Sequence, residues 1–147
     1  MEERTVGEIV LGRPVYVVQK ADCVLDAARY MTEYKAEAVP VLSDDRLVGI
    51  FTERDLMTRV VAAGLDPAST RVGAVMTPIQ STNSVALDKN TSSQDALAAM
   101  KRLDVHHLPV TDERRLIGCV SLRELHATQI EHQETKRSLL DESIPAR

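Results

Sequence analysis

An internal repeat constrains the fold of this chain more than any other feature of its sequence. Residues 18–61 align with residues 87–130 without a gap, at a constant offset of 69 residues. Identical residues recur at the same places in both copies: Lys20 and Lys89, Asp26 and Asp95, Met31 and Met100, Pro40 and Pro109, Gly49 and Gly118. A lead-in at residues 6–10 also matches residues 72–76. A repeat of this length marks one structural unit, so we expect two copies of a unit of about 60 residues.

The first copy is expected to alternate strands and helices. Hydrophobic periodicity predicts strands at 15–18, 38–42 and 47–51, and helices at 23–34 and from 53 to about 63. Asp22 is a candidate N-cap for the first helix, and Gly64 is a natural C′ residue for the second. Pro40 cannot donate a backbone hydrogen bond, so its strand is expected at a sheet edge or at an irregularity. Residues 43–46 are expected to form a turn between two strands.

The second copy repeats this order. It is expected to contain a short helix near 72–76, strands at 85–87, 107–111 and 116–120, a helix at 92–103 and a last helix from residue 122 to about residue 140. Thr91 is the expected N-cap of the helix at 92–103, with Gln94 completing a capping box. Each copy thus reads β-α-β-β-α behind a short helix. The sequence predicts an α+β (α/β-like) fold with repeat 1 at 5–64, a linker at 65–71, repeat 2 at 72–130 and a helical extension and tail at 131–147.

The composition argues against several classes of protein. The net charge of −4 leaves no basic footprint for nucleic acid, and with no Trp and a single Phe there are few platforms for stacking bases. No apolar run approaches the roughly 20 residues of a membrane helix, and the N-terminus lacks the apolar core of a signal peptide. Cys23 and Cys119 have neither metal-site nor secreted-disulfide spacing. We therefore expect a cytoplasmic protein that binds neither nucleic acid nor membrane.

One strand-to-helix turn in each copy carries polar residues of interest. In the first copy the strand ending at Phe51 leads to Thr52, with Asp55 three residues later, and Ser121 and Glu124 occupy the same places in the second. A helix N-terminus offers free N–H groups and the positive end of a dipole, which suit an anion. The Asp55 carboxylate can accept from two hydroxyls at once, as a vicinal diol requires. The turn suits the phosphate and the sugar of a nucleotide, and helix capping, with which binding is compatible, is the alternative interpretation.

Catalytic and metal-binding patterns are not evident. The chain shows no Ser/His/acid set around an activating turn and no phosphate-binding loop with Gly-Lys-Ser/Thr. His106 and His107 are adjacent in a strand, so their side chains point to opposite faces and make a poor chelating pair. No nearby Cys or third His completes a site. No enzyme activity, metal or required cofactor is expected.

The repeat, the Ala-Val-Pro-Val and His-Leu-Pro-Val strands at 38–41 and 107–110, and the Gly-to-acid turn of each copy together resemble the CBS domain. Two such domains in tandem are similar to a stand-alone Bateman module, over about residues 5–130. The resemblance implies a pseudo-two-fold pair with two clefts, where family members bind AMP, ADP, ATP, S-adenosylmethionine or NAD(H). It also implies a regulatory part of a larger system and a homodimer formed through helical faces.

The resemblance implies that a main cleft joins the first copy's turn to the second copy. Asp55 would take the ribose hydroxyls and Thr52 would help at the sugar or phosphate, while Arg54 and one of the histidines would contact phosphate. The residues implied for this cleft are Phe51, Thr52, Arg54, Asp55, Ser81, Thr82, Val85, Val105, His106, His107, Leu108 and Pro109.

The resemblance also implies a second, weaker cleft. Its residues would be Tyr16, Ala36, Glu37, Ala38, Val39, Pro40, Ser121 and Glu124. Glu124 is one methylene longer than Asp, and Glu37 brings negative charge near the place for a phosphate. This cleft is expected to bind weakly or to stay empty, with Ser121 and Glu124 serving equally well as helix caps.

The expected function is therefore regulatory. An adenosine-containing ligand would bind between the copies and change the state that is passed to an unidentified protein partner. The alternative is a dimerisation or interaction scaffold without a small ligand. Backbone recognition of adenine leaves no side-chain signature, so the sequence does not identify the ligand.

Overall fold

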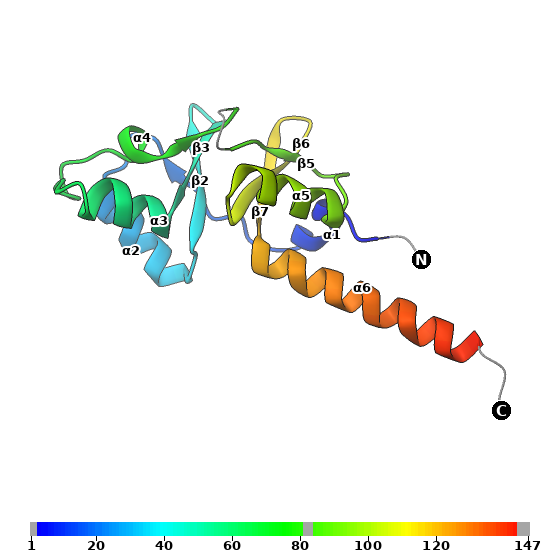
Figure 1. The fold of residues 1–147 in the computed structure, drawn as a ribbon. Coiled ribbons are helices and arrows are strands. Elements are labelled where there is room, and N and C mark those ends of the chain that lie inside the picture. The colour runs from blue at the N-terminus through cyan, green and yellow to red at the C-terminus, as the bar shows by residue number, and fades with distance from the viewer. Residues whose placement is uncertain (1–2, 81–83, 144–147) are drawn as a thin grey trace.

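The computed structural model describes residues 3–80 and 84–143, as two lobes side by side with a long helix leaving one of them (Figure 1). The first copy contains α1 (Val6–Val10), β1 (Val18–Gln19), α2 (Val24–Tyr34), β2 (Ala38–Ser43), β3 (Arg46–Thr52), α3 (Glu53–Asp55) and the π-helix η1 (Leu56–Val61). The second contains α4 (Val72–Val75), β4 (Thr77–Pro78), β5 (Leu87–Asp88), α5 (Ser93–Leu103), β6 (His107–Asp112), β7 (Arg115–Ser121) and α6 (Leu122–Ser143). The predicted α+β fold and the element order of both copies are confirmed.

Each lobe is built on one small sheet. The strand orders are β1-β2-β3-β4 and β5-β6-β7. In both lobes the first strand is parallel to the second, with Val18 opposite Val41 and Leu87 opposite Val110, and the next two strands form an antiparallel hairpin. The opening strands are only two residues long and begin later than the expected 15–18 and 85–87. β4 pairs with β3 and was not predicted.

The two hairpins turn in the same way. Asp44 and Asp45 have φ of 50° and 62°, and Glu113 and Arg114 have φ of 49° and 71°. Two consecutive positive φ values belong to a type I′ turn, whose twist matches that of the paired strands. The predicted turn at 43–46 is therefore confirmed, and its backbone geometry places β2 and β3 in register.

Pro40 lies in a strand with a neighbour on each side, so it is not on an edge strand. β1 pairs only with Val41 and Leu42, which leaves Pro40 beyond the end of β1 and makes its missing N–H harmless. The expected irregularity is present as a shift of register between Val41 and Leu42.

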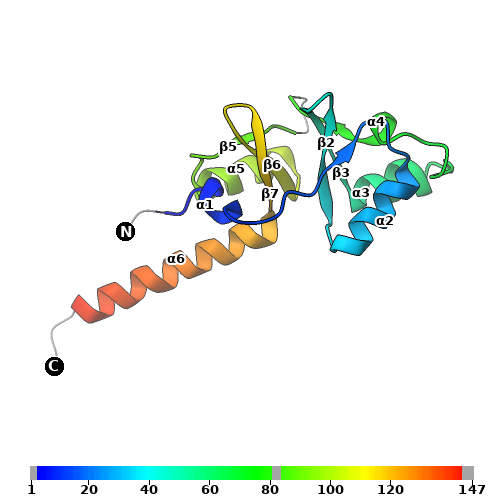
Figure 2. The same ribbon diagram turned by 180° about the vertical axis from the view of Figure 1, so that it is seen from behind.

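Each lead-in helix packs on the other copy. Figure 2 shows α1 beside β5, β6 and β7, the sheet of the second lobe. Val6, Ile9 and Val10 belong to the apolar core of that lobe, and Val72, Val75 and Met76 belong to the core of the first. The backbone joins the exchanged parts, since the Val6 N–H donates to the Thr91 carbonyl over 2.9 Å and the Val72 N–H to the Asp22 carbonyl over 2.8 Å. The two copies therefore complete each other's cores.

The exchange explains why one predicted helix start was wrong. Asp22 does not cap α2; Cys23 occupies the N-cap position without a side-chain cap bond. The Asp22 carboxylate instead accepts from the Gln19 N–H over 2.9 Å. Cys23 is extended because it bridges to Arg71, at the entrance to α4.

The start of α5 differs from the prediction in the same manner. Ser92, not Thr91, is the N-cap, and its hydroxyl accepts from the Asp95 N–H over 3.0 Å. Gln94 therefore forms no capping box with Thr91. Ser92 bridges to Thr5, at the entrance to α1, so the lead-in of the other copy sets this boundary.

Two glycines at equivalent positions of the lead-ins have different neighbours. A Cβ added at Gly7 would lie 2.8 Å from the Lys89 carbonyl oxygen, whereas one at Gly73 would lie 3.2 Å from the Lys20 carbonyl oxygen and 2.5 Å from the Lys20 Cγ, part of a flexible side chain. We expect Gly7→Ala to lower the free energy of unfolding by about 1–3 kcal/mol, because the carbonyl belongs to a packed backbone. Gly73→Ala should cost about 1 kcal/mol less, since its carbonyl neighbour is farther away and the Lys20 side chain can turn aside.

Urea unfolding of both variants measures the difference. Equal losses of stability in the two variants would contradict the backbone explanation. Circular dichroism of each folded variant checks that only stability has changed.

The helix after Thr52 widens after its first turn. It begins as α3 and continues as the π-helix η1, which ends at Val61. Gly64 has φ +73°, as expected for a C′ residue. Single π turns are frequent at functional sites, and this one begins directly after Asp55.

The last helix is longer than predicted, because α6 continues to Ser143. Leu125 is fully buried against the second lobe and Thr128 is 7% exposed, whereas Ile130 is 56% exposed. From there α6 projects away from both lobes (Figure 1).

Candidate functional site

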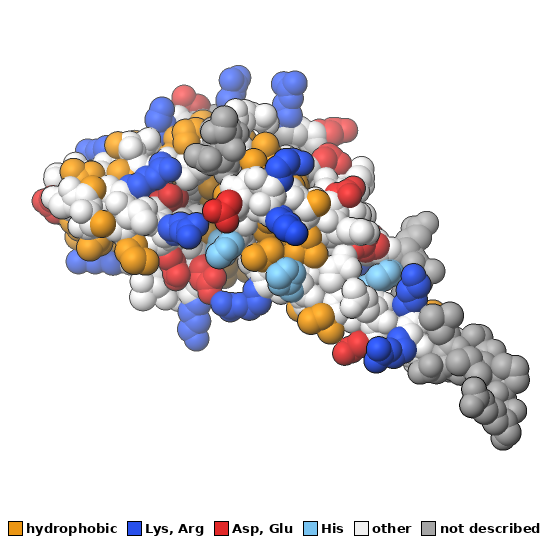
Figure 3. All heavy atoms as spheres, viewed as in Figure 1, with side chains coloured by type: hydrophobic (Ala, Val, Ile, Leu, Met, Phe, Trp, Pro, Cys, Tyr) orange, Lys and Arg blue, Asp and Glu red, His pale blue; other side chains and the backbone are white. Residues whose placement is uncertain are grey.

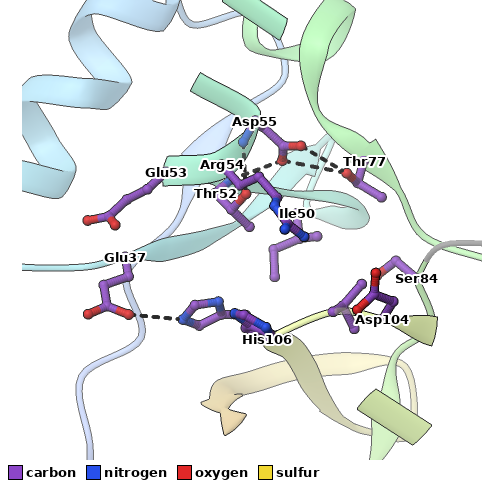
Figure 4. A pocket seen from close by; sticks show the side chains of 12 residues that line it. Glu37, Ile50, Thr52, Glu53, Arg54, Asp55, Thr77, Ser84, Asp104 and His106 are labelled. Carbon is purple, nitrogen blue, oxygen red and sulfur yellow. Dashed lines mark hydrogen bonds and ion pairs between the residues drawn. The ribbon is translucent and has the colours of Figure 1, made fainter. Parts of the chain in front are cut away.

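A cleft of about 240 Å³ lies where the two copies meet. Its described lining residues are Glu37, Ile50, Thr52, Glu53, Arg54, Asp55, Thr77, Ser84, Asp104, Val105, His106 and His107. Figure 3 shows charged and His side chains around a hollow between the lobes, and Figure 4 shows the cleft itself. The wall from β3 and α3 belongs to the first copy, and the wall at the start of β6 belongs to the second. We call this the main cleft.

The Thr52 turn forms a complete capping box. The Thr52 hydroxyl accepts from the Asp55 N–H over 3.1 Å, and the Asp55 carboxylate accepts from the Thr52 N–H over 3.1 Å. This box holds the Asp55 side chain at the end of β3, with Asp55 only 6% exposed. The predicted capping interaction is confirmed, and it orients the carboxylate in the cleft.

Two further groups hold the Asp55 carboxylate. The Thr77 hydroxyl donates to Oδ1 over 3.2 Å (Figure 4). The Arg59 Nε lies 3.6 Å from the same oxygen. Thr77 comes from the segment that follows α4, so the lead-in of the second copy reaches this site. A diol that binds Asp55 must share the carboxylate with Thr77 or displace its hydroxyl.

A second polar link joins the copies across the cleft. His107 Nε2 lies 3.5 Å from Glu37 Oε2, and Arg123 Nη2 lies 3.5 Å from Glu37 Oε1. Burial lowers the pKa of His107 below 6.5, and the Glu37 carboxylate opposes this shift without cancelling it. The imidazole is therefore neutral at pH 7, and it accepts a proton only below its usual range.

This lowered pKa predicts a pH dependence of stability. The unfolded chain binds a proton at His107 near pH 6.5, whereas the folded chain resists it, so the free energy of unfolding is retained above pH 6.5 and falls as the pH decreases below 6.5. His107→Gln should remove this part of the decline, and His126→Gln, on the exposed face of α6, should keep it. Urea unfolding at pH 5.5 and pH 7.5 compares the variants. Equal declines in the native protein and in His107→Gln would contradict the assignment.

The structure brings together six of the residues expected in the main cleft: Thr52, Arg54, Asp55, Val105, His106 and His107. Phe51 and Leu108 do not line it, because both are fully buried in the lobe cores. Pro109 is buried and Val85 packs against the core of the second lobe, and neither lines the cleft. Ser81 and Thr82 lie outside the described residues.

Six lining residues were missed for this cleft: Glu37, Ile50, Glu53, Thr77, Ser84 and Asp104. Glu37 was assigned to the other cleft. Alternation along β3 could have identified Ile50, since Phe51 points to the core and its neighbour points away. No local sequence pattern identifies Thr77 or Ser84 as cleft residues, because the chain brings them here only after α4 has crossed to the first lobe.

A second cleft of about 370 Å³ lies between β2 of the first copy and β7 and α6 of the second. Its described lining residues are Arg13, Pro14, Val15, Tyr16, Tyr34, Lys35, Ala36, Ala38, Pro40, Gly118, Cys119 and Glu124. Five of these were predicted: Tyr16, Ala36, Ala38, Pro40 and Glu124. Ser121 and Glu37 line an adjoining groove of about 260 Å³. Val39 is fully buried in the core and lines neither.

Glu124 repeats the role of Asp55 in spite of its extra methylene. Its Oε1 accepts from the Ser121 N–H over 3.1 Å, the Ser121 hydroxyl accepts from the Glu124 N–H, and its Oε2 accepts from Arg13. The Ser121 turn thus also forms a capping box, and the Glu124 oxygen outside this box already accepts from the Arg13 guanidinium. Burial raises the pKa of the Cys119 thiol in this wall to about 12, so the thiol stays protonated.

Within residues 3–80 and 84–143, no three His, Cys, Asp or Glu side chains are grouped so that they could hold a metal ion. None of the helices in these residues combines the length and the apolar character that a membrane crossing requires.

Comparisons with known proteins agree with the repeat. The CBS domain model matches residues 6–62 and again residues 72–128. Hypoxic response protein 1 of Mycobacterium tuberculosis is 32% identical over 129 residues, which cover 87% of each chain. A solved CBS-domain protein of Burkholderia ambifaria is 33% identical, with a TM-score of 0.78 over 88% of this chain and 96% of that chain. The crystal structure of Hypoxic Response Protein I, with two coordinated zinc ions, is 31% identical, with a TM-score of 0.70 over 84% of this chain and 97% of that one.

Proposed function

The chain belongs to the CBS-domain family, whose paired domains form regulatory and signal-transduction modules, and from this premise we propose that it binds an adenosine-containing ligand in the main cleft and signals to a protein partner. One observation supports this most. A buried carboxylate, Asp55, is held by a capping box in a cleft whose opposite wall is the start of β6 in the other copy.

The two walls suit the two parts of a nucleoside. The Asp55 carboxylate can accept from both ribose hydroxyls once the Thr77 hydroxyl gives way. Val105 and Ile50 offer apolar surface for the base between the walls. The N-terminus of α3 adds little to an anion site, because the capping box already satisfies the Thr52 and Asp55 N–H groups.

Signalling follows from the position of the cleft. A ligand that contacts both walls binds most tightly at one spacing of the copies, and it shifts their equilibrium by its difference in affinity for the two states. The link from Glu37 to His107 and Arg123 crosses the same gap, so ligand binding and this link depend on the same spacing. The protein is expected to be a homodimer in solution, which sedimentation equilibrium checks.

The experiment is thermal unfolding of the purified protein with AMP, ADP, ATP, S-adenosylmethionine, NADH, adenosine and GTP, each with and without EDTA. A ligand at 100 times its Kd adds roughly 2.7 kcal/mol, which for a chain of this size raises Tm by about 5–10 °C. A rise with an adenosine ligand and none with GTP supports the proposal. If no ligand raises Tm, the ligand-free interaction scaffold becomes the better account. Turnover of a bound ligand would instead indicate an enzyme.

A further inference from the structure

The described lining of the main cleft is rich in negative charge. Four carboxylates line it, those of Glu37, Glu53, Asp55 and Asp104, and Arg54 is the only Lys or Arg among the described lining residues. Burial lowers the pKa of His107, so its ring is mainly neutral at pH 7 and adds little positive charge. A phosphorylated ligand would therefore bring like charge into the cleft.

Only part of this charge is balanced by neighbours. Glu37 lies near Arg123, and Asp55 lies near Arg59. In the part of the chain that the structure describes, no ion pair involves Glu53 or Asp104. Both side chains are exposed at the rim of the cleft, where they act on an incoming ligand through water as well as directly.

A second, independent feature points to a polar group of a ligand. Ser84 is 1% exposed and lines the cleft, and its hydroxyl has no hydrogen-bond partner among the described residues. Ser84 lies on the same side of the cleft as Asp104 (Figure 4). Buried hydroxyls are normally hydrogen-bonded, so this one is suited to a ligand atom such as a ribose hydroxyl or a ring nitrogen.

The second cleft has the opposite balance. Arg13 and Lys35 are among its described lining residues, and Glu124 is the only carboxylate there. Arg13 already binds Glu124, which leaves Lys35 in excess. The contrast shows that the charge of the main cleft does not follow from the repeat itself.

We infer that the main cleft selects adenosine ligands whose 5′ substituent is neutral or cationic, as in adenosine or S-adenosylmethionine, and discriminates against the phosphates of AMP and ATP. This selectivity rests on the proposed function, because it concerns the same site. A carboxylate and a phosphate about 7 Å apart in a water-like medium repel each other enough to weaken binding roughly threefold per charge. The discrimination should therefore reach about tenfold or more for AMP.

Isothermal titration of the purified protein at low salt and pH 7.5 tests this inference with four probes: adenosine, S-adenosylmethionine, AMP and Mg²⁺-free ATP. Asp55→Asn identifies the part of the binding that belongs to the main cleft. The charge variant is Glu53→Gln with Asp104→Asn, which preserves shape. Asp104 has φ 54°, a left-handed conformation that Asn also adopts readily.

The matched control is Glu33→Gln with Asp45→Asn. Glu33 is exposed on α2, and Asp45 is exposed with φ 62° in a hairpin turn, so the control changes net charge equally outside the cleft. The expected result is Asp55-dependent binding of adenosine and S-adenosylmethionine at least about tenfold tighter than that of AMP. The charge variant should strengthen AMP binding about tenfold or more and weaken that of S-adenosylmethionine, and the control should do neither.

The outcomes separate this inference from the proposed function. Asp55-dependent binding of AMP or ATP as tight as that of adenosine overturns the selectivity and leaves the proposed function intact. An unchanged AMP affinity in the charge variant overturns it as well. AMP binding that survives Asp55→Asn, while adenosine binding does not, supports the selectivity and places AMP elsewhere. Absence of binding by all four probes overturns the selectivity, and it overturns the proposed function too when ADP and NADH also leave Tm unchanged.

Discussion

Phe51→Ala is expected to lower the free energy of unfolding by about 3–5 kcal/mol, the largest effect on stability that the structure predicts. Phe51 is the only Phe of the chain, is fully buried and packs in the first-lobe core with residues from α2, β2, η1 and α4. Truncation leaves a cavity that a β-strand cannot close, because its neighbours are held in the sheet. Urea unfolding of the native and variant proteins measures the loss.

The same residue was expected at the ligand site, so a milder variant separates the two roles. Phe51→Leu should keep the fold, at a smaller cost, and should leave ligand affinity within about twofold, because Phe51 does not line the main cleft. Val39→Ala is a suitable comparison, since Val39 is also fully buried in this core. Loss of ligand binding by a folded Phe51→Leu protein would indicate that Phe51 contributes to the ligand site.

Asp55→Asn is expected to weaken binding of an adenosine ligand by about 100-fold, the largest effect on function. A charged acceptor contributes roughly 1.5–3 kcal/mol per hydrogen bond, and the neutral amide offers one acceptor oxygen for two ribose hydroxyls. The Asn side chain can still accept from the Thr52 N–H, so the cap is retained and the fold should persist. Isothermal titration with the ligand that gives the largest Tm rise measures the loss.

Glu124→Gln provides the comparison, because Glu124 holds the equivalent place in the second turn. Affinity that falls with Asp55→Asn and persists with Glu124→Gln assigns the ligand to the main cleft. The reverse pattern would move the ligand to the second cleft, and equal affinity in both variants would remove the ribose role from either acid. Native-like circular dichroism of each variant excludes unfolding as the cause.

The local conformations could be predicted because they depend on residues a few positions apart. The Thr52 and Asp55 side chains satisfy each other's backbone N–H groups within one turn of helix, and Asp44 and Asp45 turn the chain within two residues. Because the sequence repeats, each such prediction for the first copy also applied to the second. The errors at the starts of α2 and α5 arose where a local signal competed with a distant partner, the lead-in of the other copy.

The composition of the main cleft could be predicted only in part. Thr52, Asp55 and His107 follow from the repeat and the family resemblance, whereas Thr77, Ser84 and Asp104 reach the cleft from elements that carry no motif. Glu37 was predicted only for the second cleft, whereas it lines both the main cleft and the groove that adjoins the second. A residue at the junction of two copies can contribute to both sides, which its neighbours in sequence do not reveal.

The sequence by itself determined the two repeats, the order of their elements, the hairpin turn and the Thr52 cap, because these follow from periodicity and from contacts within a few residues. Tertiary structure alone decided the exchange of the lead-in helices, the burial of Phe51 in the core, and the acidic lining of the main cleft. Those features depend on shape complementarity between segments far apart in the chain. The Gly118 Cα approaches Val10 so closely that an added Cβ would lie 2.7 Å from the Val10 Cβ, a fit that no local pattern encodes.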